Sequence, residues 1–397
     1  MVVNGRAYRL PAAPVVGVCL DGCDERYFEA ALAGGDLPAV RRMERGGVRT
    51  RAGGALPSFT NVNNVSLVTG VPPSVHGISG NFFLDPETGE TVMMNDPRFL
   101  RVETLLAGAA RAGRRVAVVT AKEKLRRLLS DGVQGIAVST EFLDQARPET
   151  HGVGDLPALL GRPTPPIYSA DASLAVLDLG IRLLETDRAD FLYLSLTDYI
   201  QHRHSPAEPE AISFIQEVDR RLGRLLDLGA VLGATADHGM NAKHGPDGTP
   251  RVLYLETLLP EHFGDGARVV LPITDPYVVH HGALGACAGV YLAEPRQAAA
   301  VAEFLRTLPG ITDALPRADA ARRLELPADR IGDVVVLSDA ATVLGRRPED
   351  HDLSVLEGPL RSHGGRDEAT VPFLLSRPLN GEWPHLRNFD LFAALLQ

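Results

Sequence analysis

Six side chains of the types that bind divalent metals stand at comparable places along the chain. Three are aspartates that follow short apolar runs within two residues, and three are histidines near them or near a later run. In chain order they are Asp21, Asp198, His202, Asp237, His238 and His363. Mixed carboxylate and imidazole ligands suit zinc or another first-row divalent ion. Six ligands are too many for one tetrahedral zinc ion and suffice for two ions that keep open positions.

Each residue also has an ordinary structural interpretation. An aspartate at a strand end commonly caps a turn, and a single histidine is commonly a hydrogen-bonded buried group. Their joint occurrence at successive strand ends favours the metal site. Asp198 and His202 are four residues apart, so they share a face if the chain turns helically there.

A hydroxyl and an amide follow in a second segment. Thr60 stands at the expected start of a helix in PSFTNVNNVSLVTG (57–70), after Pro57. A helix N-terminus offers free N–H groups and a favourable dipole to an anion. Thr60 is a candidate N-cap, and a hydroxyl at the same place can also be a metal-activated nucleophile. Asn81, in HGISGN (76–81), is a candidate donor to a phosphoryl oxygen.

Two cations form the third element of the site. Lys122 and Lys124 lie in TAKEKL (120–125), directly after the apolar run VAVV (116–119). Paired lysines are ordinarily solvated at the surface. Their position after a core strand favours recognition of a second anionic group beside the metals.

These residues need a sheet whose strand ends meet at one edge. Short β-branched apolar runs alternate with amphipathic helical patterns over 171–187, 208–228 and 295–308. Runs that are apolar on both faces are typical of a parallel sheet covered by helices. The expected fold is α/β, a mostly parallel central sheet with helices on both faces. The runs are 15–20, 116–119, 191–196, 231–235, 334–337 and 372–375.

The chain divides into a core and an insertion. We expect a metal-binding core of 1–240 and 360–397, and a smaller cap lobe inserted over 241–359. Prolines cluster around GRPTPPIY, which suggests a second short insertion over 140–170.

Composition excludes several classes of protein. The 397 residues carry 40 basic and 50 acidic side chains, a net charge of −10, without a Lys/Arg-rich run. Binding to nucleic acid or to a membrane surface is therefore not expected. There is no stretch of 18 apolar residues to span a bilayer. The three cysteines are too few and odd in number for a disulfide framework, which predicts a cytoplasmic protein.

The motifs LDGCD, TDYIQH, ADHGM and SHGG resemble those of the alkaline phosphatase superfamily, in the same order. Within its nucleotide pyrophosphatase/phosphodiesterase-like branch, NNVSLVTGVPPSVHGISGN and TAKEKL are most similar to the phosphonoacetate hydrolases. The resemblance covers roughly 12–130, 190–245 and 360–376. It implies two Zn²⁺ ions at the rim of an α/β sheet, a small anionic phosphonate substrate, and cleavage of its carbon–phosphorus bond.

The resemblance also implies a role for each site residue. One zinc ion is expected on Asp21, Thr60, Asp237 and His238, and the other on Asp198, His202 and His363. Thr60 is the expected nucleophile, with direct attack by a metal-bound hydroxide as the alternative. Asn81 is expected to bind a phosphoryl oxygen, and Lys122 and Lys124 the substrate carboxylate. A homodimer is possible.

Other hypotheses remain open. A nucleotide phosphodiesterase would share the ligands and Thr60, but it needs aromatic side chains for the base, and only 6% of residues are aromatic. A phosphoglycerate mutase is less favoured because it normally has a serine nucleophile. A non-catalytic metal- or anion-binding module would not need Thr60. Further histidines are expected at the rim (His204, His244, His280 and His281) or as support for their own loop (His76).

Overall fold

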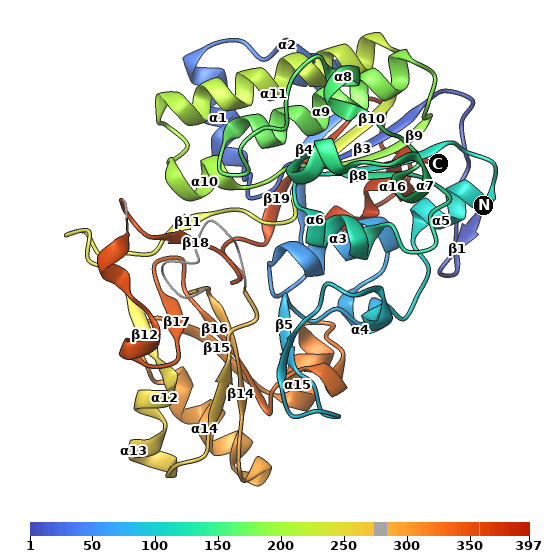
Figure 1. Ribbon diagram of the computed structural model, residues 1–397. Coiled ribbons are helices and arrows are strands. Elements are labelled where there is room, and N and C mark those ends of the chain that lie inside the picture. The colour runs from blue at the N-terminus through green and yellow to red at the C-terminus, as the bar shows by residue number, and fades with distance from the viewer. Residues whose placement is uncertain (274–283, 357) are drawn as a thin grey trace.

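The computed structural model describes residues 1–273, 284–356 and 358–397. Its centre is a seven-stranded sheet (Figure 1). In spatial order the strands are β4 (Val48–Gly53), β19 (Thr370–Leu375), β10 (Val231–Thr235), β3 (Val15–Cys19), β9 (Phe191–Ser195), β7 (Val116–Thr120) and β8 (Gly135–Ser139). The five strands from β10 to β8 are mutually parallel, and β19 is antiparallel to both of its neighbours. The predicted mostly parallel sheet is confirmed.

Helices cover both faces of this sheet, above and below it in Figure 1. Each face has its own apolar cluster, and the strands contribute alternate side chains to the two. One face carries α1 (Glu25–Gly34), α2 (Pro38–Gly46), α9 (Ala170–Glu185) and α11 (Pro209–Asp227). The other carries α3 (Thr60–Thr69), α5 (Leu105–Arg111), α6 (Glu123–Leu129) and α16 (Leu391–Leu395).

Helix α11 illustrates how the sequence forms this layer. Pro209 is its first residue, where the missing N–H costs nothing, and Glu208 precedes it. Phe214, Val218 and Leu222 recur on one face and are buried against the sheet side. Burying each such side chain stabilises the fold by about 2 kcal/mol.

Helix α3 is different, because all ten of its residues are buried. It lies between the sheet and a second lobe, so it has no face open to water. Its buried asparagines, threonines and serine must therefore find hydrogen-bond partners inside the protein.

The second lobe contains an antiparallel sheet in the order β13 (Arg268–Val270), β14 (Cys287–Tyr291), β16 (Val334–Ser338) and β15 (Ile311–Pro316). The placement of run 334–337 in the central parallel sheet was therefore wrong. Val334 and Val336 pack in a cluster with α14 (Ala298–Arg306), whereas Val335 and Leu337 pack toward α3. Both faces are covered, so the run is as apolar as a central parallel strand. The lobe also contains β12 (Val252–Tyr254), α12 (Leu255–Leu258), α13 (Pro260–Phe263), α15 (Arg317–Arg323) and β17 (Val343–Gly345).

A short ribbon connects the lobe to the core. Strand β11 (Asn241–Ala242) leaves the core directly after β10, and β18 (Arg361–Ser362) returns beside it in antiparallel pairing. The two connections are thus adjacent, as expected for a single insertion. The bounds 241–359 remain our proposal for its extent.

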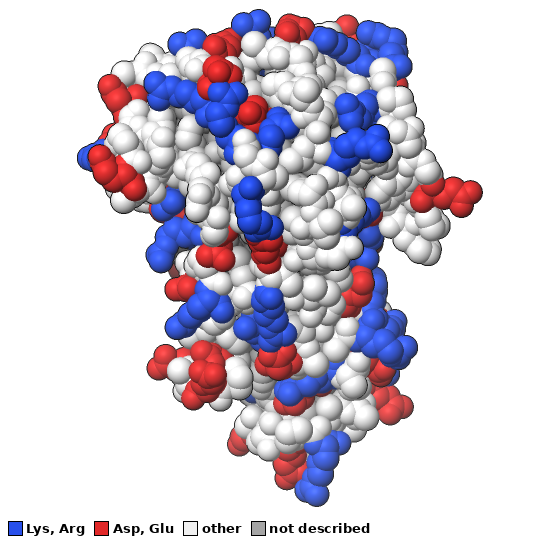
Figure 2. Space-filling view, turned by 90° about the vertical axis from the view of Figure 1, so that its right-hand side faces the viewer, with Lys and Arg blue, Asp and Glu red and all other residues white. Residues whose placement is uncertain are grey.

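The remaining segments add little to the site. Residues 140–160 form η2 (Thr140–Gln145), α7 (Pro148–His151) and α8 (Leu156–Leu160), whose Leu143 and Leu156 join the core cluster. None of the helices that the structure describes is long and apolar enough to cross a bilayer. On the face in Figure 2, acidic and basic side chains are intermixed.

Candidate metal and phosphoryl-transfer site

The three aspartates of the predicted site follow three adjacent parallel strands. Asp237 follows β10, Asp21 follows β3, and Asp198 follows β9, in the spatial order of the sheet. Ligand sites form at the carboxyl ends of strands in open α/β sheets. Gly22 permits the turn after Asp21: its φ is +70°, and a Cβ there would lie 2.8 Å from Cβ of Asp198.

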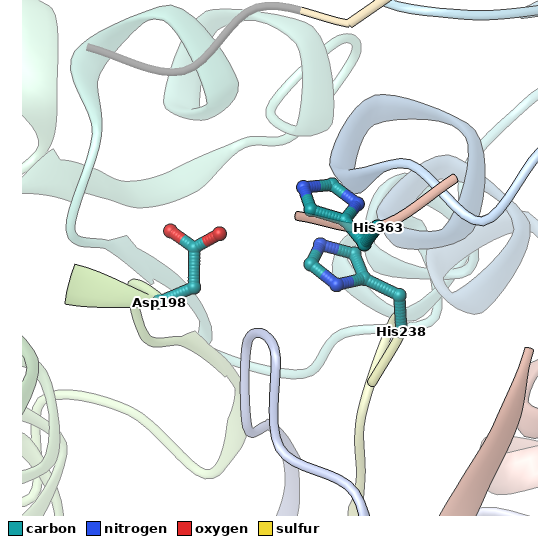
Figure 3. A group of neighbouring side chains, drawn as sticks. All are labelled: Asp198, His238 and His363. Carbon is teal, nitrogen blue, oxygen red and sulfur yellow. The ribbon is translucent and has the colours of Figure 1, made fainter. Parts of the chain in front are cut away.

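The ligand atoms form two groups that share one histidine. Those of Asp21, Asp237 and His238 lie within 4.8 Å of one another, and so do those of Asp198, His238 and His363. In Figure 3 the carboxylate of Asp198 lies across from the two stacked rings of His238 and His363, whose centroids are 3.5 Å apart.

His202 joins the second group. It lies in α10 (Tyr199–Arg203), and its Nε2 is 3.1 Å from Oδ2 of Asp198. The predicted helical turn between Asp198 and His202 is therefore present, and the structure brings all six predicted ligands together.

Backbone carbonyls orient all three imidazoles. Nδ1 of His238 lies 2.9 Å from the carbonyl of Gly239, Nδ1 of His363 lies 2.8 Å from that of Ser58, and Nδ1 of His202 lies 3.1 Å from that of Arg361. A carbonyl only accepts, so each Nδ1 carries the proton and each Nε2 presents a lone pair. Metal-binding histidines are commonly held in this way.

The buried groups have an excess of acceptors. Among the described residues, both carboxylate oxygens of Asp21 and Nε2 of His363 have no hydrogen-bond partner. Nε2 of His238 faces Oδ1 of Asp21 at 3.3 Å. Two such acceptors repel each other unless a proton or a cation lies between them. The donor set therefore fits divalent cations.

Burial also disfavours the negative charge of these carboxylates. It raises the pKa of Asp21 well above its usual range, with the charges of Asp198 and Asp237 adding to the effect. Burial and the charge of Asp198 raise the pKa of Asp237 to about 7. Burial lowers the pKa of His363 well below its usual range and keeps its ring neutral. Bound cations would favour the ionised carboxylates and the neutral imidazole.

Lys122 lies inside this group rather than at the surface. Its Nζ is 3.1 Å from Oδ1 of Asp198 and 3.6 Å from Oδ2 of Asp21, and its side chain is 4% exposed. Burial opposes ionisation of Asp198, but the ammonium group of Lys122 outweighs it and holds the pKa of that carboxyl well below its usual range. Lys124 is half-buried in α6, one residue after Glu123.

Thr60 lies beside the candidate ligands. It is the first residue of α3, and Phe59 takes the N-cap position, so the N-cap interpretation of Thr60 was wrong by one residue. Oγ1 of Thr60 is 3.4 Å from Nε2 of His238. The N-terminus of α3 therefore points its dipole and hydroxyl into the cluster.

The loop that carries Asn81 is held from both sides. Its Oδ1 accepts from the backbone N–H of Asn61 at 3.2 Å, and its own N–H donates to Pro272 of the lobe. His76 supports the same loop as predicted, because its Nδ1 accepts from the N–H of Ile78 and its Nε2 lies 2.9 Å from Ser66 Oγ. Burial lowers the pKa of His76 to about 3, so it stays neutral.

A sequence profile for type I phosphodiesterase / nucleotide pyrophosphatase matches residues 15–366, the span that holds all of these side chains. The chain belongs to this family. Ectonucleotide pyrophosphatase/phosphodiesterase family member 1 of Mus musculus is 27% identical over 246 residues, which are 57% of this chain and 24% of that protein. The Homo sapiens protein of the same name is 27% identical over 222 residues, or 54% of this chain and 21% of that protein. The chain thus spans less than a quarter of the length of these relatives.

Solved structures are similar to nearly the whole chain. Phosphonoacetate hydrolase from Sinorhizobium meliloti 1021, solved with phosphonoacetate and with phosphonoformate, is 48% identical, with a TM-score of 0.95 over 99% of this chain and 98% of that one. The predicted resemblance to phosphonoacetate hydrolases is confirmed. Murine ectonucleotide pyrophosphatase/phosphodiesterase 5 is 18% identical, with a TM-score of 0.63 over 96% of this chain and 94% of that one, and shares the fold.

Neither the cysteines nor His204 and His244 belong to the two candidate ligand groups described above. The thiols of Cys19 and Cys23 are buried, which raises their pKa and keeps them protonated. His204 pairs with Glu208 at 2.9 Å, and Nδ1 of His244 bonds the carbonyl of Gly245. His280 and His281 lie outside the described residues.

Sequence reasoning missed the residues that hold the candidate ligands. Asn64 contacts Asp237, and Glu368 bonds the N–H of Gly365 through its carboxylate and that of Gly239 through its carbonyl. Asn64 lies within NNVSLVTGVPPSVHGISGN, a segment that points to a family but not to this residue. Glu368 follows two charged residues in GGRDEAT, so its sequence context does not separate it from surface residues.

Proposed function

We propose that this chain hydrolyses the carbon–phosphorus bond of phosphonoacetate to give acetate and phosphate. The observation that carries the proposal is the 48% identity to a phosphonoacetate hydrolase over 99% of the chain. Two buried groups of candidate ligands next to Thr60 support it. They are Asp21, Asp237 and His238, and Asp198, His238 and His363.

The site would hold two divalent ions, for which zinc is the preferred candidate. Imidazole and carboxylate ligands suit zinc, and a two-ion site accommodates six protein side chains with open positions for substrate. We assign Asp21, Thr60, Asp237 and His238 to one ion and Asp198, His202 and His363 to the other. When bound, such ions neutralise phosphoryl oxygens and lower the pKa of an attached hydroxyl.

The proposed reaction takes place in two steps, both of them at Thr60. Oγ1 of Thr60 attacks phosphorus, so a P–O bond forms while the P–C bond breaks. The electron pair of that bond moves to carbon and delocalises into the carboxylate. The carbon takes up one proton, which balances the proton that Thr60 loses, and the product leaves as acetate. Water then hydrolyses the phosphothreonine, which releases phosphate and restores the hydroxyl.

The polar groups around Thr60 orient the substrate. Oδ1 of Asn81 accepts from the backbone of Asn61, so its Nδ2 is the end that can donate to a phosphoryl oxygen. Lys122 and Lys124 bind the carboxylate, where negative charge develops as the carbon departs. A charge placed there stabilises the transition state more than the ground state.

A comparison of substrates tests the proposal. The purified, zinc-loaded protein is given phosphonoacetate, phosphonopyruvate and a nucleotide phosphodiester at equal concentrations, and phosphate or nucleotide release is measured. We expect phosphonoacetate to have the highest kcat/KM. A higher kcat/KM for the nucleotide diester would favour a nucleotide phosphodiesterase, and zinc binding without turnover of any substrate would favour a non-catalytic module.

Variants of the two lysines extend this comparison. Lys122→Ala and Lys124→Ala are expected to lower kcat/KM on phosphonoacetate by about 10²-fold, because they remove charge from the leaving group. An aryl phosphate ester has no carboxylate and should lose far less. Lys122 also lies near Asp198, so the zinc content of each variant is measured alongside. Equal losses on both substrates at full zinc content would exclude the carboxylate clamp.

A further inference from the structure

Asn64 lies one helical turn after Thr60 and is fully buried. Residues four apart on a helix share a face, so Asn64 lies beneath Thr60 on the side of α3 that faces the sheet. Its amide contacts both the sheet and the candidate metal site. A buried amide has four hydrogen-bonding positions, and each of them can be assigned here.

The amide oxygen is held by β9. Oδ1 of Asn64 accepts from the hydroxyl of Tyr193 at 2.7 Å and from Oγ of Ser195 at 2.9 Å. These two donors occupy both lone pairs of the oxygen. Because Tyr193 and Ser195 belong to a central strand of the sheet, they provide a rigid support.

The amide nitrogen points to the site. Nδ2 of Asn64 donates to Oδ2 of Asp237 and to the backbone carbonyl of Thr60, each at 3.1 Å. A carboxylate and a carbonyl only accept, so this orientation of the amide is the one that satisfies all four neighbours. The other carboxylate oxygen of Asp237, Oδ1, accepts from the N–H groups of Gly22 and His238.

We propose that Asn64 is a positioning residue that fixes Asp237 and the first turn of α3 relative to each other and to β9. With Oδ1 bound by two N–H groups, Oδ2 of Asp237 is the oxygen left to face a cation, and Asn64 sets its direction. The same amide group holds the carbonyl of Thr60. The inference rests on the proposed function, in which Asp237 and Thr60 belong to one metal site.

Zinc affinity tests this role independently of turnover. The metal-free parent and Asn64→Ala are titrated with zinc in competition with a chromophoric chelator, and kcat on phosphonoacetate is measured at saturating zinc. We expect Asn64→Ala to weaken one of two zinc sites by about 10- to 100-fold. The matched control is Asn63→Ala, an adjacent buried asparagine that bonds Ala55, Phe59 and Asn388 and none of the proposed ligands. It should lower the unfolding temperature and leave zinc affinity near the parent value.

A second variant keeps the test decisive if Asn64→Ala does not fold. Tyr193→Phe combined with Ser195→Ala removes the support of the amide oxygen and leaves Asn64 in place, and we expect a smaller loss of zinc affinity in the same direction. Parent-like zinc affinity in Asn64→Ala or, failing that, in the double variant would overturn the inference, as would an equal loss in Asn63→Ala. A parent that binds two zinc ions but leaves phosphonoacetate intact would overturn the proposed function instead.

Discussion

Phosphate release from phosphonoacetate is expected to fall by roughly 10³-fold or more in a Thr60→Ala variant. The substitution removes the oxygen that attacks phosphorus, and the rest of the cluster remains in place. The hydroxyl lies 3.4 Å from Nε2 of His238, at the start of a helix whose residues are all buried. Steady-state kinetics with a continuous phosphate assay measure the effect.

Two further variants separate this loss from damage to the fold. Thr60→Ser keeps a hydroxyl and should retain much of the parent rate. Thr69→Ala makes the same change at the other end of α3, where the threonine hydroxyl bonds the carbonyl of Val65, and should leave the rate near that of the parent. If Thr60→Ala binds zinc and still releases phosphate at the parent rate, a solvent-derived hydroxide is the attacking group and Thr60 is not the nucleophile.

Lys243→Met is expected to destabilise the fold by about 3–5 kcal/mol. Lys243 and Glu368 form an ion pair of 2.9 Å with both side chains 0% exposed. Removing the ammonium group leaves a buried carboxylate without its counter-ion. The pair lies between the start of the inserted lobe and the loop after His363, so the loss should appear in the unfolding transition of the metal-free protein. Urea denaturation followed by circular dichroism measures it.

The double variant Lys243→Met with Glu368→Gln is the control. It removes both charges and keeps an amide oxygen for one of two donors, Asn241 on Oε1 or Gly365 on Oε2, so we expect part of the lost stability to return. A cost below about 1 kcal/mol in the single variant, typical of an exposed pair, would contradict the buried position of these groups.

Most of the central sheet was predictable because its strands are short and apolar on both faces. The same property misplaced residues 334–337, since α14 and the cluster around Phe59 cover that strand as completely as helices cover a central one. Two edge strands were missed. β4 contains three arginines or threonines in a row, and the apolar part of β8 after its exposed glycine is only three residues long, so neither has an apolar run of four.

The candidate ligands were predictable for a physical reason. Parallel neighbours end at one edge, so aspartates after β10, β3 and β9 must meet, whatever lies between them in sequence. Asn64 and Glu368 were not predictable, because their roles depend on which atoms surround them. The proximity of Lys122 to Asp198 also required the structure, since it depends on β7 lying next to β9.

Titration of the metal-free protein with zinc, followed by phosphate release from phosphonoacetate, tests the central claim most directly. The proposed site predicts no measurable turnover before zinc is added, and a rise in rate that reaches its plateau at two equivalents per chain. Full activity in the protein before any metal is added, or a plateau at a single equivalent, would contradict a reaction that depends on two cations beside Thr60.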